Sequence, residues 1–324
     1  MTVFFQITVT TVLALAVCVG AITYFRNVRT PRPPVGVFNV RDIFLMMGFV
    51  LALPYVYLTL PGATLPVVLA LAFAGGLSVG YQPIVGNGRL RWALIAALTA
   101  SVFVFHLAFG DTALPYWVAN SCVVGLVVVS ATNLNVQGGM RLKNVAWFLV
   151  VLTAYDAFFA TVVPLTQELS EAIQGYPFAP AAGLRIGEDL GAVVGMGDLL
   201  AYALFTTAAY KAYGRPGLWT GIVLVTLFGA VAPVATLHIT TAVTGHAPTL
   251  IPAQVFFGPA AFIGYLCLRR RGPERRMVEV VFSRDREAVQ QQVPVLAAAA
   301  DTREDIEQPR TDRIPGHASA SPTP

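Results

Sequence analysis

Two aspartates are the residues of this chain whose type and position point most directly to chemistry. Asp156 lies in the apolar run WFLVVLTAYDAFFATVVPL and Asp198 in AVVGMGDLLAYALFTTAAY, whereas the other carboxylates fall in connections or in the C-terminal segment. An ionisable group at the centre of a membrane helix costs about 2.5 to 3.5 kcal/mol on insertion scales. Two such residues therefore need a use that offsets this cost.

A pair of carboxyl groups held a few ångströms apart can hydrolyse a peptide bond. Both groups cannot ionise easily at that separation, so one keeps its proton. The ionised member takes a proton from water while the protonated member polarises the carbonyl that is attacked. This chemistry needs no metal and no organic cofactor. It requires that the two aspartates meet and that water reaches them.

The runs that carry the aspartates belong to a larger set of apolar segments. Hydrophobic residues make up 56% of the chain and charged residues 12%, and the mean hydropathy is +0.67. Many runs are about 20 residues long, which is enough to cross a bilayer core. We therefore predict an all-α polytopic membrane protein whose domain, residues 1–268, has nine transmembrane helices. The predicted spans are 4–24, 43–59, 63–80, 92–110, 114–132, 145–166, 190–213, 218–241 and 250–268.

The basic residues alternate between connections and so predict the orientation. The even-numbered connections carry only one basic residue, Arg185. The odd-numbered connections carry the others and are therefore expected to be cytoplasmic. The N-terminus is then outside and the C-terminus inside. No basic residue precedes the first run, so we expect a retained span rather than a cleaved signal peptide. Short connections and no organellar targeting sequence indicate a prokaryotic plasma membrane. The basic residues concerned are Arg26, Arg29, Arg32, Arg41, Arg89, Arg91, Arg141, Lys143, Lys211, Arg215 and Arg269 to Arg271.

The predicted spans place the two aspartates at one depth. Asp156 is 11 residues past Val145 on the cytoplasmic side, and Asp198 is 8 past Leu190 on the outer side. At about 1.5 Å per helical residue, both lie roughly 12 to 17 Å into the membrane. Gly195 and Gly197 remove side-chain bulk and are expected to let a partner helix approach closely.

The motifs around the aspartates resemble those of a known family. Ala154-Tyr155-Asp156-Ala157-Phe158 and Gly195-Met196-Gly197-Asp198 are similar to the paired motifs of the presenilin and signal peptide peptidase family of intramembrane aspartyl proteases. That family carries them on the sixth and seventh of nine spans, as predicted here. Asn120 and Leu142-Lys143-Asn144 look like the family's fifth span and its exit. The family also has a Pro-Ala-Leu turn before its ninth span, and the nearest match here is Pro248-Thr249-Leu250. Pro252-Ala253 is the competing register.

The resemblance implies a presenilin-like fold and a set of roles. Asp156 and Asp198 would be the catalytic pair, and Tyr155 would support the neighbouring carboxyl. Gly195 and Gly197 would allow close helix approach. Pro248, Thr249 and Leu250 would shape the site and contact an extended substrate. The predicted orientation is that of signal peptide peptidases, so the substrates would be single-span proteins with a cytoplasmic N-terminus or remnant signal peptides.

Other interpretations of the same residues remain open. Asp156 and Asp198 could bind the coupling ion of a proton- or cation-coupled transporter or channel. A prepilin-peptidase relative would also use Gly-x-Gly-Asp. Gly76-Leu77-Ser78-Val79-Gly80 fits the Gly-x-Ser-x-Gly pattern of serine hydrolases, with His106 as the candidate base. That pattern requires a strand-to-helix elbow, so small residues near a helix end explain it better.

Two segments outside the spans carry further expectations. The sixth connection links the two aspartate spans, and we expect a short helix in its first half and irregular chain after Gly175. Residues 269–324 are expected to form a cytoplasmic tail, basic and then disordered, whose arginines lie on anionic lipid rather than on nucleic acid. His238 and His246 are expected to be interfacial or solvated. Besides the substrate, the expected partners are membrane lipids.

Overall fold

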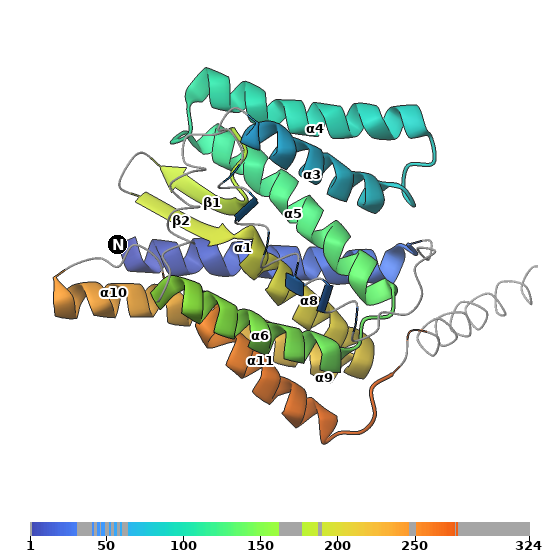
Figure 1. Cartoon of the computed structure of the whole chain (residues 1–324), viewed down its shortest axis with the longest axis vertical. Helices are drawn as coiled ribbons and strands as arrows, with labels where there is room; N and C mark the ends of the chain where they lie inside the picture. The colour runs from blue at the N-terminus through green and yellow to red at the C-terminus, as the bar shows by residue number, and fades with distance from the viewer. Residues whose placement is uncertain are drawn as a thin grey trace, which may run out of the picture. The chain divides into compact units, whose positions relative to one another are not determined.

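The computed structural model describes residues 2–30, 64–161, 177–186, 190–245, 251–275 and 277, with scattered positions between 41 and 59. Within these ranges the chain is mostly helical, with one two-stranded sheet (Figure 1). The helices are α1 (Thr2–Asn27), α3 (Leu65–Tyr81), α4 (Gly88–Phe109), α5 (Leu114–Gln137), α6 (Leu142–Thr161), α8 (Met196–Tyr213), α9 (Arg215–Leu224), the π-helix η1 (Val225–Val231), α10 (Ala232–Thr244) and α11 (Gln254–Arg269).

Five helices of the described chain are long and apolar enough to cross a membrane. All five coincide with predicted spans: α1, α4, α5 and α6 with the first, fourth, fifth and sixth, and the continuous helix formed by α9, η1 and α10 with the eighth, 218–241. The prediction of a mostly helical membrane protein is confirmed at this level. α3 is an apolar helix of 17 residues, and of the predicted span 43–59 only scattered positions are described. The two remaining predicted spans contain α8 and α11, with 18 and 16 residues.

The start of the predicted seventh span is wrong, because a β-hairpin precedes α8. β1 (Ala181–Ile186) pairs antiparallel with β2 (Leu190–Gly195), where we expected irregular chain followed by helix. A short apolar run does not distinguish a strand from a buried helix by hydropathy. Gly183 permits the pairing, since a Cβ there would lie 2.9 Å from the Cα of Val193.

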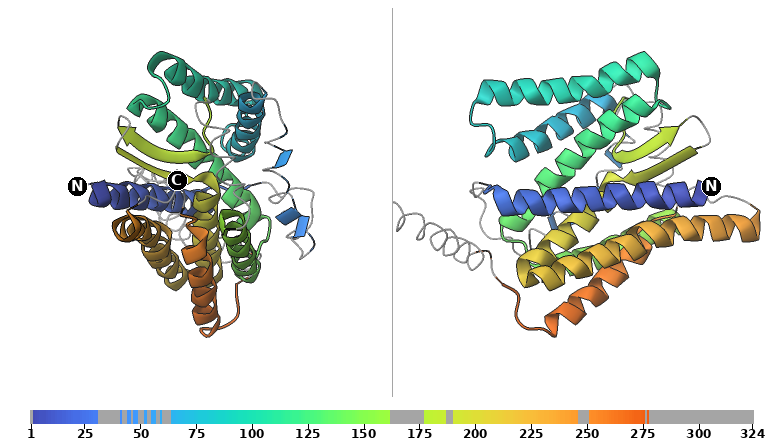
Figure 2. Two further views of the ribbon diagram at one scale, coloured as in Figure 1. Left: turned by 60° about the vertical axis from the view of Figure 1, so that its left-hand side comes forward. Right: turned by 180° about the vertical axis from the view of Figure 1, so that it is seen from behind.

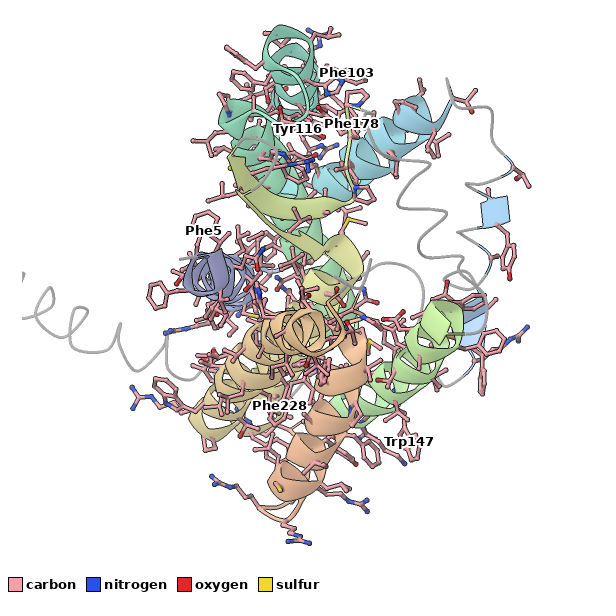
Figure 3. All side chains as sticks on the ribbon, turned by 90° about the vertical axis from the view of Figure 1, so that its left-hand side faces the viewer. Phe5, Phe103, Tyr116, Trp147, Phe178 and Phe228 are labelled. Atoms are coloured by element: carbon pink, nitrogen blue, oxygen red, sulfur yellow. The ribbon has the colours of Figure 1, made fainter. Side chains whose placement is uncertain are left out.

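The hairpin is fixed to α5 and to the helices around it. Asn120 of α5 donates to the carbonyl oxygens of Ala179 and Ala181, at 3.0 and 2.7 Å. Phe178, just before β1, is fully buried and packs edge-to-face on Phe103 with ring centroids 4.8 Å apart (Figure 3). β2 leads directly into α8, so these anchors also position the start of the helix that carries Asp198.

α8 is the central helix of the described bundle. It contacts α1, α5, α6, α9 and α11, while α3 and α4 pack against α5 at the far side from α6 (Figures 1 and 2). α8 is not among the five helices that are long and apolar enough to cross a membrane, because it carries polar side chains. Thr206, Thr207 and Lys211 are buried by protein neighbours. Exposed apolar side chains such as Phe4, Leu107 and Val243 lie on outer helices, as a lipid-facing surface requires.

Candidate active site

The structure brings the carboxyl groups of Asp156 and Asp198 together. Asp156 lies five residues before the end of α6 at Thr161, and Asp198 is the third residue of α8. The charge of Asp198 acts directly on the Asp156 carboxyl group. Two like charges in a poorly hydrated site repel each other, so a proton shared between them lowers the free energy of the pair.

The common level of the aspartates arises from antiparallel packing of α6 and α8. At the opposite ends of these helices, Lys211 of α8 donates to the carbonyl oxygens of Met140 and, at 3.1 Å, of Val136. The predicted depth of Asp198 was counted along a helix from Leu190, and this count is wrong because 190–195 is a strand. The two aspartates lie at the same level because one is near the C-terminus of α6 and the other near the N-terminus of α8.

The two glycines of the Gly-x-Gly-Asp motif differ in their surroundings. A Cβ on Gly195 would lie 3.3 Å from Oδ2 of Asp198, so this glycine leaves room for the carboxyl group. A Cβ on Gly197 would meet no atom within 4 Å. The expected close helix approach is therefore absent at Gly197 among the described residues. It occurs instead at Gly258 of α11, where a Cβ would lie 2.8 Å from the carbonyl oxygen of Leu149 on α6.

Gln254, the first residue of α11, is a site residue that the sequence did not reveal. Its Nε2 donates a hydrogen bond of 2.9 Å to Oδ1 of Asp198. Its backbone oxygen accepts a 2.9 Å hydrogen bond from the Thr153 hydroxyl on α6, one turn before Asp156. Gln254 thus links both aspartate helices. The available signal was a glutamine directly after Pro252-Ala253, the competing register of the turn; Pro248, Thr249 and Leu250 lie outside the described residues.

Two tyrosines border the aspartates. Tyr155 is half-buried, packs on Phe159 with ring centroids 4.6 Å apart and lies within electrostatic reach of Asp156. Tyr202, on α8, is fully buried and within electrostatic reach of both aspartates. Its hydroxyl donates to the carbonyl oxygen of Gly229 in η1, at 2.9 Å. The sequence predicted Tyr155 but not Tyr202, because nothing local distinguishes Tyr202 from a packing residue.

The π-helix explains why the Gly229 carbonyl is available to Tyr202. In an α-helix this carbonyl would accept from the backbone nitrogen of residue 233, which is a proline without an N–H. The local widening to i→i−5 pairing, from Ala232 N–H to Leu227 oxygen, adjusts the helix around this gap. The buried Tyr202 hydroxyl donates to the Gly229 oxygen at this point of the helix.

Residues considered for other chemistry have structural partners elsewhere. Gly76 to Gly80 lies inside α3, where Gly80 packs on Ser130 of α5, so the serine-hydrolase pattern is not at a strand-to-helix elbow. The His106 ring stacks on Tyr116 with centroids 5.4 Å apart.

His238, expected to be interfacial or solvated, is partly buried and hydrogen-bonded. Its Nε2 is 2.8 Å from Oε1 of Gln6, whose Nε2 donates to the Gly191 oxygen of β2. This chain of bonds joins α10, α1 and the hairpin. His246 lies outside the described residues.

The described part of the site offers two carboxyl groups, a glutamine amide and two tyrosine rings. In the same part of the chain, no three His, Cys, Asp or Glu residues are grouped so that they could hold a metal ion. The available chemistry is thus proton transfer by paired carboxyl groups or binding of a cation between them. No protein-family model and no curated protein matches this chain.

Proposed function

We propose that this chain is an intramembrane aspartyl protease with a nine-span, presenilin-like fold. It would hydrolyse peptide bonds within transmembrane segments or remnant signal peptides, in a prokaryotic plasma membrane with its C-terminus in the cytoplasm. The observation that carries the proposal is the meeting of Asp156 and Asp198 from antiparallel helices, with Gln254 bonded to one of them. The resemblance of their flanking motifs to the presenilin and signal peptide peptidase family supports it further.

The proposed mechanism uses one ionised and one protonated carboxyl. Because Gln254 already donates to Oδ1 of Asp198, we assign the ionised role to Asp198 and the shared proton to Asp156. Asp198 takes one proton from water as the water oxygen bonds to the carbonyl carbon. Asp156 gives its proton to the carbonyl oxygen, and a neutral gem-diol results.

Collapse of the gem-diol restores both carboxyl groups. The C–N bond breaks as Asp198 returns its proton to the departing amine nitrogen. Asp156 recovers a proton from one hydroxyl of the gem-diol, which becomes the new carboxyl carbonyl. The reaction consumes one water molecule and returns both aspartates to their starting protonation states. A substrate helix must first unwind locally, because its peptide bonds are otherwise shielded by internal hydrogen bonds.

Cleavage of a fluorogenic single-span peptide by the purified protein in detergent tests the proposal. We expect Asp156→Asn and Asp198→Asn each to abolish cleavage, because either change removes half of the proton exchange while keeping side-chain size. Asp111→Asn is the matched control, since Asp111 lies in the turn before α5, and it should cleave like the wild type.

Two outcomes would overturn the proposal. One is retention of cleavage by either aspartate variant. The other is absence of wild-type cleavage over a panel of single-span peptides, combined with a proton or cation flux into proteoliposomes that depends on Asp156 and Asp198. That second outcome would instead establish ion-coupled transport, in which the paired carboxyls hold the ion.

A further inference from the structure

Gln254 has one polar atom whose use the fold does not explain. Its backbone oxygen is bonded to Thr153 and its Nε2 to Asp198. The other polar atom of the side chain, Oε1, is buried and has no hydrogen-bond partner among the described residues. The whole side chain is only 1% exposed.

An unpartnered buried amide oxygen calls for an explanation. Folded proteins satisfy nearly all such acceptors, because burying one without a donor loses its hydrogen bonds to water. Oε1 and Nε2 are attached to the same carbon, so the free acceptor lies beside the carboxyl group of Asp198. A ligand that brings an N–H donor to Asp198 would satisfy it.

An unwound peptide is such a ligand. When a membrane helix opens for hydrolysis, its backbone N–H groups lose their internal acceptors, and no lipid group at that depth replaces them. The protein must supply acceptors on both sides of the bond that is cut. Backbone oxygens of helices α6, α8 and α11 are largely committed to their own helices, whereas Oε1 of Gln254 is free.

We propose that Gln254 binds the substrate backbone: Nε2 positions Asp198, and Oε1 accepts one N–H of the unwound segment next to the scissile bond. This inference rests on the proposed protease function and adds a substrate contact to it. The substrate class it requires is an extended peptide with a free backbone N–H.

Backbone amide-to-ester substitution in the peptide substrate tests the contact directly. A series of fluorogenic single-span peptides carries one ester at each of the six bonds nearest the cleavage site. Each ester removes one N–H and leaves the side chains unchanged. We expect one position at which the ester lowers the wild-type kcat/KM by about 5- to 10-fold, the loss expected for one neutral hydrogen bond.

Variants of Gln254 separate its two contacts. Gln254→Met keeps the length but removes donor and acceptor; its kcat on the all-amide peptide should fall about 10- to 100-fold, and the ester at the sensitive position should cost nothing further. Gln254→Glu keeps an acceptor oxygen and removes the donor. It should lose kcat while keeping the ester cost. A role limited to folding predicts no such dependence on the substrate.

Gln137→Met on α5 is the matched control. Gln137 is buried and bonded to the Val28 oxygen and the Thr30 nitrogen, at 3.1 and 2.9 Å, away from the aspartates. Its loss should lower the melting temperature but leave the ester profile as in the wild type. Melting curves of all variants show that the Gln254 effects are measured on folded protein.

The inference is overturned if the ester costs are the same in wild type and Gln254→Met at every position. That result leaves the protease function standing when the aspartate variants are inactive. If the wild type cleaves none of the peptides, the proposed function fails and this inference fails with it.

Discussion

Asp198 is held by few but specific contacts. Gln254 donates to one carboxyl oxygen, and Gly195 leaves space beside the other. Two hydroxyl groups of the site bond elsewhere: Thr153 bonds to backbone oxygens of Leu149 and Gln254, and Tyr202 bonds to Gly229. At the scale of single residues, the described site therefore has polar groups that orient Asp198 without neutralising it.

Tyr202→Phe tests the link between the site and the π-helix. The variant removes a buried hydroxyl and its hydrogen bond to the Gly229 oxygen, which Pro233 cannot replace because it has no N–H. We expect a loss of about 1 to 3 kcal/mol in the free energy of unfolding, measured by reversible denaturation in detergent. Tyr213→Phe is the control, since its half-buried hydroxyl makes a longer bond of 3.2 Å to Gly272 and should lose less. Equal losses in the two variants would contradict this account.

At the scale of elements, the site depends on how closely α11 lies on α6. Gly258 of α11 packs on Thr153 and Leu149 of α6, and the Thr153 hydroxyl also donates a hydrogen bond to the backbone oxygen of Gln254. A side chain at position 258 has no space. The close packing of α11 on α6 therefore decides whether Gln254 reaches Asp198.

Gly258→Ala should displace α11 from α6. A Cβ would be 2.8 Å from the Leu149 oxygen and closer still to the Thr153 hydroxyl, so the helices must separate. We expect a loss of about 1 to 3 kcal/mol in stability, as for overpacking, together with loss of peptide cleavage. Gly75→Ala on α3 is the control, because a Cβ there meets nothing within 4 Å. Wild-type cleavage by Gly258→Ala would show that the contact is dispensable.

At the scale of the whole molecule, the segment after α11 belongs to the membrane domain. We predicted the end of the membrane domain at residue 268; α11 ends at Arg269, and the compact unit extends to Met277. Glu274 accepts hydrogen bonds from the backbone nitrogens of Leu142 and Lys143 at the start of α6. Arg275 donates to the oxygens of Tyr210 and Ala212 at the end of α8. One short segment thus caps both aspartate helices.

Truncation distinguishes this capping segment from the remainder of the C-terminal region. A chain ending at Met277 should fold and cleave like the full chain, because it keeps both caps. A chain ending at Arg271 should melt lower, with about 1 kcal/mol lost for each helix cap removed. Glu274→Gln in the full chain isolates the charge at the α6 N-terminus. Equal melting temperatures of the two truncated chains would exclude the capping role.

The parts of the site that depend on local chemistry could be predicted from the sequence. Asp156, Asp198, Tyr155 and Gly195 stand out because carboxyl groups are rare in apolar runs and their neighbours form short motifs. Most helices could be predicted from hydropathy, because hydropathy is also a local property of the sequence. The hairpin did not, since β2 is as apolar as a span and its strand conformation depends on pairing with β1 and on α5.

The sequence alone therefore determined a helical membrane protein with two aspartates placed to meet, because hydropathy and residue type are properties of each segment by itself. The tertiary structure decided what surrounds them. Gln254 is 56 residues from Asp198 and bonds to it only because α11 packs on α6 and α8. Tyr202 bonds to the Gly229 oxygen only because α8 packs on η1. Such contacts arise from packing between distant segments, which no local pattern records.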